Sequence, residues 1–244
     1  MIPKIIHFCW FGKGKMPPLA EKCIASWKKY CPDYEIICWN EDNYDVSKNK
    51  YMFDAYKAKK WGFVPDFARL DIIFQFGGIY LDTDVELIKP IDNLLVENKA
   101  FAGVEIPGQI ALGLGFGAEK NNPVIKLMLD QYEHLRFLNE NGEMNLVPSP
   151  QIQTKLLREY GLSSDNELQV INDCFCVYPK DFFNPYNFEN GKIEITENTY
   201  SIHHYAGSWA SSRNKSNTRI YHFISRVFGE KFAKKLRKVL RRNK

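Results

Sequence analysis

The segment from residue 61 to residue 87, WGFVPDFARLDIIFQFGGIYLDTDVEL, carries six charged side chains in an otherwise apolar run. Two of them, Asp82 and Asp84, close residues 79–81, which their apolar and aromatic side chains predict to be a buried strand. Residues two apart on an extended chain point to the same side, so both carboxylates face one place. Because unpaired buried charges are costly, the pair predicts a cation or a polar ligand at this strand end.

Predicted strands and helices alternate along the rest of the chain. Apolar and β-branched runs predict strands at residues 2–10, 34–39 and 100–106, with shorter ones within 168–178 and 200–205. Helical spacing of apolar residues predicts helices at 20–31, 51–60, 66–76, 123–135 and 151–160. The glycines at 77 and 78 are a helix stop. The order predicts an α/β sheet, mostly parallel, with ligands at the carboxyl ends of its strands.

Composition predicts an ordinary globular protein. The chain has 244 residues, of which 45% are hydrophobic, enough for a full core in one large domain. It has six cysteines but no CxxC pair, which favours reduced thiols over disulfides or a zinc site. The sequence has no apolar run long enough to span a membrane and no signal-peptide pattern at its start, so we expect a cytoplasmic protein.

The net charge of +4 hides a strong asymmetry. Residues 213–244 carry twelve basic side chains and one acidic one, whereas residues 1–212 are net acidic. We therefore divide the chain into a domain at 1–212 and a basic, amphipathic helical tail at 213–244. The tail has the composition of an interfacial helix drawn to anionic lipid, which would make the protein peripheral on the inner face of the plasma membrane. Packing of the tail on the core is an equally open alternative. No nucleic-acid partner is expected.

The acidic pair suits a divalent cation. Two hard carboxylate oxygens are typical ligands of Mg²⁺ or Mn²⁺, which complete their shell with water and substrate phosphates. A D-x-D triplet alone is weak evidence, since an acidic turn in water has the same sequence. The apolar strand before it, the glycine pair, and Asp66 and Arg69 on one turn of the preceding helix favour a site.

Three motifs in order resemble those of the glycosyltransferase family 32 sugar transferases. They are IPKIIHFCWFG at the start, DFARLDIIFQFGGIYLDTDV, and YSIHHYAGSW near residue 205. This family includes bacterial capsule and lipopolysaccharide enzymes and the yeast initiating mannosyltransferase, and it is distantly similar to the catalytic domain of clostridial glucosylating toxins. The resemblance implies a GT-A type, Rossmann-like mixed sheet flanked by helices. It also implies retaining transfer of a hexose from a nucleotide sugar, with Mn²⁺ or Mg²⁺.

The resemblance gives donor-binding roles to several residues. Trp10 matches an aromatic that stacks on the nucleobase, although a core tryptophan would look the same. Asp66 and Arg69 match a pair that holds the donor, with a surface ion pair as the alternative. Asp82 matches a carboxylate that contacts ribose and sugar hydroxyls, and Tyr80 is placed with this donor-binding set.

The resemblance also gives roles at the phosphate side of the donor. Asp84 matches the direct metal ligand. Of the adjacent His203 and His204, only one can face the site, and the resemblance favours His204 as the second ligand, with His203 in reserve. Ser208 and Trp209 are expected to donate hydrogen bonds to the leaving diphosphate.

The predicted activity is thus transfer from a UDP-sugar, with GDP-mannose as a second option, to a saccharide or lipid-linked oligosaccharide. A role in bacterial surface polysaccharide synthesis (capsule, O-antigen or lipopolysaccharide) follows from the resemblance. Residues 109–117 and 148–151 occupy positions on the acceptor side, but the acceptor and linkage stay open. We expect attack by the acceptor hydroxyl from the same face as the leaving diphosphate, since no residue clearly serves as a covalent nucleophile.

Two other function classes were weighed. The string IYLDTDV partly fits the nucleophile motif of haloacid-dehalogenase-like phosphatases, in which the first aspartate, here Asp82, is phosphorylated. That fold expects its motif near the N-terminus and a later acidic pair, and the sequence offers neither convincingly. The other alternative is a non-catalytic saccharide- or membrane-binding protein whose tail is the functional part.

Overall fold

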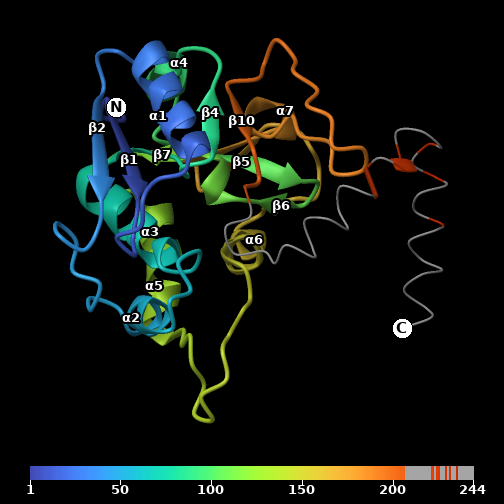
Figure 1. Cartoon of the computed structure of the whole chain (residues 1–244). Coiled ribbons are helices and arrows are strands. Elements are labelled where there is room, and N and C mark those ends of the chain that lie inside the picture. The colour runs from blue at the N-terminus through green and yellow to red at the C-terminus, as the bar shows by residue number, and fades with distance from the viewer. Residues whose placement is uncertain (207–220, 223, 226–228, 230, 232–234, 236–244) are drawn as a thin grey trace.

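A mixed sheet forms the centre of the computed structural model, which describes residues 1–206, 221, 222, 224, 225, 229, 231 and 235 (Figure 1). The strands of this sheet are β1 (Ile5–Cys9), β2 (Glu35–Trp39), β3 (Gly78–Tyr80), β5 (Ala100–Ile106), β6 (Gln109–Ile110), β7 (Phe116–Ala118), β8 (Gln169–Ile171) and β9 (Phe175–Tyr178). They lie in the order β2-β1-β3-β7-β5-β9-β8, with β6 paired to β5. A second, two-stranded sheet joins β4 (Val85–Leu87) to β10 (Ser201–His203).

The expectation of a mostly parallel sheet is wrong. Strands β2, β1 and β3 are mutually parallel, as are β5 and β9, but β7 is antiparallel to both β3 and β5. Strand β8 is antiparallel to β9, and β6 to β5. The physical reason is the connection from β5 to β7, which runs through β6 and a short 3-10 turn, η1 (Leu112–Leu114), with no crossover helix to return the chain to the starting edge.

Helices cover both faces of the sheet, as the α/β prediction required. The helices are α1 (Pro18–Tyr30), α2 (Lys50–Lys57), α3 (Pro65–Phe76), α4 (Asp92–Glu97), α5 (Pro123–His134), α6 (Ser149–Glu159) and α7 (Lys180–Phe183). One core cluster joins α2, α3, α5 and α6 to the sheet, and a second joins α1, α4 and α7 to it. Strand β5 feeds both, because Ala100, Ala102 and Val104 lie in the first cluster and Phe101 in the second.

The end of α3 has the geometry that its glycine pair predicted. Gly77 and Gly78 have φ angles of 68° and 98°, which other residues rarely adopt. A Cβ on Gly78 would lie 2.7 Å from the Ile5 carbonyl oxygen, so only glycine lets β3 pack this closely against β1. The helix therefore stops sharply, and β3 begins at a fixed position in the sheet.

His7 fastens the strands that precede the site. Its side chain is fully buried, its Nε2 lies 2.9 Å from the Gly77 carbonyl oxygen, and the Trp39 indole donates to its Nδ1 at 3.0 Å. This pattern makes the ring neutral with its proton on Nε2. Burial lowers the pKa of His7 to about 4, against the opposing hydrogen bond to Gly77. The ring thus joins β1, β2 and the end of α3 without carrying charge.

Strands β1, β3 and β5 run in the same direction. Strand β3 is parallel to β1, and both β3 and β5 are antiparallel to β7, which lies between them. Their carboxyl ends therefore meet at one edge of the sheet. Residues following β1, β3 and β5 are gathered there, which is where ligands of open α/β sheets bind.

The six cysteines are all free, as expected from their spacing. No helix among the described residues combines the length and apolar character needed to cross a bilayer. Most of the predicted tail at 213–244 lies outside the described residues. Of its described part, Tyr221 donates to Glu189 at 2.7 Å and Ser225 is buried.

Candidate active site

Asp82, Asp84 and His203 form a cluster with the ligand set of a metal site. One ligand atom from each lies within 4.8 Å of the others. Strand pairing assembles the cluster, because β10 is antiparallel to β4 with His203 opposite Val85. His203 Nε2 lies 3.0 Å from Asp84 Oδ1, and the Ala206 N–H donates to Asp84 Oδ2 at 2.8 Å. Residues 119 positions apart thus share one site.

The cluster is electrostatically coupled. Burial raises the pKa of Asp84, but its hydrogen bond and charge interaction with His203 outweigh burial and hold that pKa below its usual range. Burial lowers the pKa of His203, and the Asp84 carboxylate more than reverses this, so the net shift is upward. The two groups therefore stabilise each other as carboxylate and imidazolium. A divalent cation between the carboxylates would replace the imidazolium proton as the positive charge.

The histidine that faces the aspartates is not the one that the sequence favoured. His203, which was held in reserve, faces the aspartates, whereas His204 faces Glu86, with its Nε2 2.7 Å from Glu86 Oε2. Lys22 also contacts that Glu86 oxygen at 2.7 Å. The alternation of the two rings was correctly expected, but which ring faces inward depends on the register of β10 against β4.

Arg69 links α3 to the strand end. Its Nη2 donates to Asp66 at 2.8 Å, and its Nη1 lies 3.6 Å from Asp82. The side chains of Asp66 and Arg69 are only 4% and 6% exposed, which excludes the alternative of a surface ion pair. Burial raises the pKa of Asp66 to about 6, although the Arg69 charge opposes this. An arginine held between two carboxylates is positioned to meet a third anionic group at this edge.

Trp10 and Tyr80 differ in burial and in what they contact. Trp10 follows β1, is half-buried outside both core clusters, and donates its indole N–H to the Gly14 carbonyl at 2.6 Å. It is thus not a core tryptophan. Tyr80 is 1% exposed, and the Arg69 guanidinium lies 5.2 Å from its ring centre, so its ring supports Arg69 from below. Ser208 and Trp209 lie outside the described residues.

The 3-10 turn η1 closes over Asp82. A Cβ on Gly113 would clash with the Asp82 carboxylate and come within 3.3 Å of Arg69 Nη1. The glycine-rich stretch thus presents bare backbone to the site. The sequence analysis placed residues 109–117 on the acceptor side, and it gave no contact between this stretch and Asp82 or Arg69.

Two sets of polar residues lie near the site, of which the sequence interpretation had assigned only Gln109 to the site, within its acceptor-side stretch. Beneath Asp66, Tyr51 and Tyr132 are fully buried with ring centres 5.3 Å apart, and the wholly buried Gln153 of α6 is close enough to affect the pKa of Tyr132. The second set is at the end of β5, where the half-buried Glu105 accepts a hydrogen bond from Gln109 at 2.8 Å. The spacing of apolar residues does not predict either set of contacts, since both sets depend on which helix packs against which strand.

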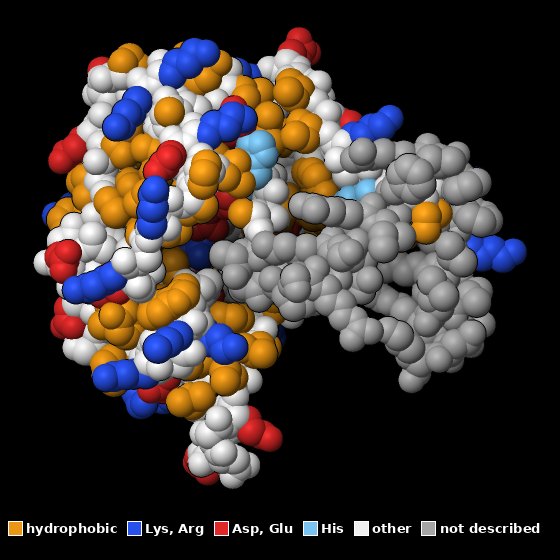
Figure 2. Space-filling model, in the orientation of Figure 1, with side chains coloured by type: hydrophobic (Ala, Val, Ile, Leu, Met, Phe, Trp, Pro, Cys, Tyr) orange, Lys and Arg blue, Asp and Glu red, His pale blue; other side chains and the backbone are white. Residues whose placement is uncertain are grey.

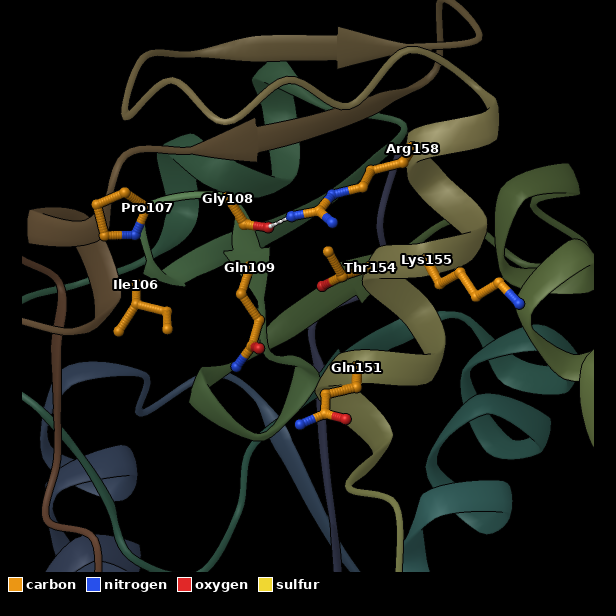
Figure 3. Close-up of a pocket in the computed structure, with 8 residues that line it drawn as sticks. All are labelled: Ile106, Pro107, Gly108, Gln109, Gln151, Thr154, Lys155 and Arg158. Atoms are coloured by element: carbon orange, nitrogen blue, oxygen red, sulfur yellow. Dashed lines mark hydrogen bonds between the residues drawn. The ribbon is translucent and has the colours of Figure 1, made fainter. Parts of the chain in front are cut away.

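Figure 2 shows acidic and basic side chains recessed in the middle of one face. A separate pocket of about 250 Å³ lies between the β5–β6 turn and α6 (Figure 3).

Residues 17–101 match the family model described as the glycosyltransferase sugar-binding region containing a DXD motif. This match includes Asp66, Arg69, Asp82 and Asp84. Over most of its length the chain is also 28% identical to the uncharacterized glycosyltransferase L373 of Acanthamoeba polyphaga mimivirus, covering 86% of this chain and 84% of the viral one. The chain is thus similar to glycosyltransferases over most of its length and to the DXD-containing sugar-binding region over residues 17–101.

Other glycosyltransferase relatives match over shorter spans. Inositol phosphoceramide mannosyltransferase 3 of Schizosaccharomyces pombe is 31% identical over 102 residues, which is 38% of this chain and 27% of the yeast protein. Subversion of eukaryotic traffic protein A of Legionella pneumophila is 24% identical over 189 residues, 63% of this chain and 28% of that protein. The chain therefore matches less than a third of the length of the yeast and Legionella proteins.

Two solved glycosyltransferase structures are similar to this chain at low identity. The PaToxG glycosyltransferase has a TM-score of 0.49 at 19% identity, covering 65% of this chain and 68% of that one. A glycosyltransferase involved in glycosylation of the major capsid of PBCV-1 has a TM-score of 0.48 at 14% identity, covering 89% and 100%.

Proposed function

We propose that this glycosyltransferase moves a hexose from a nucleotide sugar to a saccharide with retention of configuration, and that it depends on a divalent cation. The observation that carries the proposal is the cluster of Asp82, Asp84 and His203 beside a buried, carboxylate-held Arg69. Two carboxylates suit Mg²⁺ or Mn²⁺, and the imidazole favours Mn²⁺, which accepts nitrogen ligands more readily. Asp84 and His203 would hold the ion.

The positive groups of the site act on the diphosphate of the donor, and Asp82 and Trp10 act on its hydroxyls and nucleobase. The ion, when bound, neutralises charge on the leaving diphosphate. Arg69 is aimed at the same edge of the sheet and adds a second positive charge there, fixed in place by Asp66 and Tyr80. Asp82 is positioned to accept hydrogen bonds from donor hydroxyls, and Trp10 offers a half-buried ring at the end of β1 for the nucleobase.

Between the two routes to retention, the engagement of the nearby carboxylates favours direct same-face attack over a covalent intermediate. Asp66 is paired with Arg69, Asp84 with His203, and Asp82 lies against Arg69. A carboxylate committed to a cation is a poor nucleophile, so we favour attack by the acceptor hydroxyl on the face that the diphosphate leaves. The diphosphate oxygen then accepts the hydroxyl proton. Mass spectrometry of a trapped glycosyl-enzyme adduct on any of these carboxylates would overturn this step.

The donor and the biological setting remain predictions. A UDP-sugar is favoured from the sequence, and the yeast relatives named as mannosyltransferases keep GDP-mannose as the second option. We retain synthesis of a bacterial surface polysaccharide, in the cytoplasm and with membrane contact through the basic tail, as the proposed role. The phosphatase alternative with Asp82 as nucleophile loses support, since Asp82 lies within the region matched by the sugar-binding family model.

The test is a screen of nucleotide sugars with Mn²⁺, first by thermal stabilisation and then by donor hydrolysis. We expect one UDP- or GDP-sugar to stabilise the full chain and to release its nucleoside diphosphate slowly. Release of inorganic phosphate from a sugar phosphate would instead identify a phosphatase, and stabilisation by saccharides without hydrolysis would identify a binding protein.

A further inference from the structure

The pocket beside α6 lies on the same edge of the sheet as the metal cluster. Asp82 and Asp84 follow the carboxyl end of β3. The pocket begins at Ile106, at the carboxyl end of β5, and β5 runs in the same direction as β3. Only β7 separates these two strands, and β5 continues past the level of Tyr80, alongside the segment that carries Asp82 and Asp84. A ligand in the pocket would therefore be a neighbour of one at the cluster.

Two amide side chains define the interior of the pocket. Gln109 projects from β6 and Gln151 from α6, and both amides point toward the same space (Figure 3). Ile106 and Pro107 supply an apolar wall, and Ile106 is 41% exposed. This combination of amides with an apolar surface has the chemistry of a saccharide site, since one amide can both donate to and accept from sugar hydroxyls.

The two walls are fixed to each other by other residues. Arg158 of α6 donates to the Gly108 carbonyl at 2.8 Å, and the Ile110 N–H donates to Thr154 at 3.1 Å. These bonds commit Arg158 to the backbone, and Lys155 points away from the two amides (Figure 3). The Glu105 carboxylate also lies beside the pocket, since Gln109 donates to it, so the pocket favours a neutral ligand over an anionic one.

Side-chain contacts connect the walls of the pocket to residues of the proposed donor site, through Gln109 on one side and through α6 on the other. On one side, Gln109 donates to Glu105 at 2.8 Å, and Glu105 neighbours Tyr205, whose ring centre lies 4.2 Å from that of His203. Burial raises the pKa of the Tyr205 hydroxyl, and the Glu105 charge raises it further. On the other side, Ser149 begins α6 two residues before Gln151. Its hydroxyl lowers the pKa of Asp66, which burial raises more strongly.

We propose that this pocket binds the acceptor as a neutral saccharide, whose hydroxyls are held by Gln109 and Gln151 and whose apolar face rests on Ile106 and Pro107. The inference rests on the proposed function, because an acceptor site has meaning only in a transferase. It assigns donor and acceptor to adjacent positions along one sheet edge. Gln109 and Gln151 then act on the acceptor and leave the donor untouched.

The experiment separates the two substrates. Saturation-transfer NMR on the full chain, with diamagnetic Mg²⁺ and UDP or GDP, uses the methyl α-glycosides of glucose, galactose and mannose as acceptor probes. Hydrolysis of the donor selected by the nucleotide-sugar screen is measured on the same samples. The variants are Gln109→Ala, Gln151→Ala and their combination, and the matched control is Glu159→Ala at the exposed end of α6.

We expect at least one glycoside to bind the unmodified chain. The combined variant should weaken that binding by about tenfold or more, since two hydrogen-bonding groups are lost, while donor hydrolysis changes less than about twofold. Three results overturn the inference: no glycoside binds, the combined variant binds as well as the control, or donor hydrolysis falls in step with binding. Failure of the proposed function is distinct, since the unmodified chain would then hydrolyse no nucleotide sugar.

Discussion

Two carboxylate–histidine pairs lie next to each other where β4 begins and β10 ends, yet their surroundings differ. Asp84 pairs with His203 at 3.0 Å, and Glu86 pairs with His204 at 2.7 Å. Burial does not distinguish them, because both carboxylates are 19% exposed and the histidines are 13% and 20% exposed. Asp82 adds a second carboxylate to the first pair, whereas Lys22 adds a cation to the second. The first pair has room for another positive charge, and the second is already neutralised.

Two pairs of the same residue types can thus have different roles, because the charges next to each pair decide whether it can bind a cation. A carboxylate cluster with excess negative charge recruits a cation, while a carboxylate that already holds a lysine and a histidine is a fastening between α1, β4 and β10. We therefore expect the Asp84–His203 pair to serve catalysis and the Glu86–His204 pair to serve stability.

The largest effect is expected at Asp84. Asp84→Asn removes a charged metal ligand with little change of shape, so donor hydrolysis with Mn²⁺ should fall by about a thousandfold. The matched variant Glu86→Gln should retain most of the activity. Equal losses in the two variants would abolish the distinction between the pairs.

His7 differs from His203 and His204 because its hydrogen-bond partners are a backbone carbonyl and an indole, not a carboxylate. Its folded-state pKa of about 4 lies below the ordinary value of 6.5, so the unfolded chain binds its proton first as the pH falls. The stabilisation is complete above pH 6.5 and should decline by about 3 kcal/mol toward pH 4. Urea unfolding across this range should show a smaller decline for His7→Gln. The same pH dependence in both proteins would contradict the burial account.

The two site histidines should differ in metal affinity. His203→Ala is expected to weaken Mn²⁺ binding by at least roughly tenfold, whereas His204→Ala, which leaves Glu86 with Lys22, should change it little. Titration calorimetry with Mn²⁺ and a nucleoside diphosphate measures both. A stronger effect from His204→Ala would restore the preference drawn from the sequence.

The smallest effect is expected at the Lys22–Glu86 contact. The lysine side chain is 60% exposed, so the ion pair should contribute about 1 kcal/mol or less and weaken with salt. Chemical unfolding of Lys22→Met at low and high salt tests this. A large, salt-independent loss would mean that the second pair does more than fasten α1 to β4.

Local patterns in the sequence predicted the parts of the fold that depend on local chemistry. The helix before Gly77, the strand after it and the facing of Asp82 and Asp84 follow from apolar spacing, glycine conformation and the period of a strand. The short strand β7 was not predicted, and with it the antiparallel part of the sheet was missed, because the pairing of a short strand depends on partners far along the chain.

The candidate site was only partly predictable for the same reason. The inward histidine follows from the pairing of β10 with β4, and the proximity of Glu105 to Tyr205 follows from where β5 ends. The burial of the Asp66–Arg69 pair required knowledge of what packs on α3. Each of these is a long-range contact, to which neither composition nor periodicity is sensitive.

The most direct test of the central claim is Mn²⁺ binding followed by electron paramagnetic resonance in the presence of a nucleoside diphosphate. We predict that the unmodified chain and Glu86→Gln bind one Mn²⁺ with similar affinity, and that Asp84→Asn binds it far more weakly. Unchanged Mn²⁺ binding in Asp84→Asn would contradict the assignment of the β3 strand end as the metal centre.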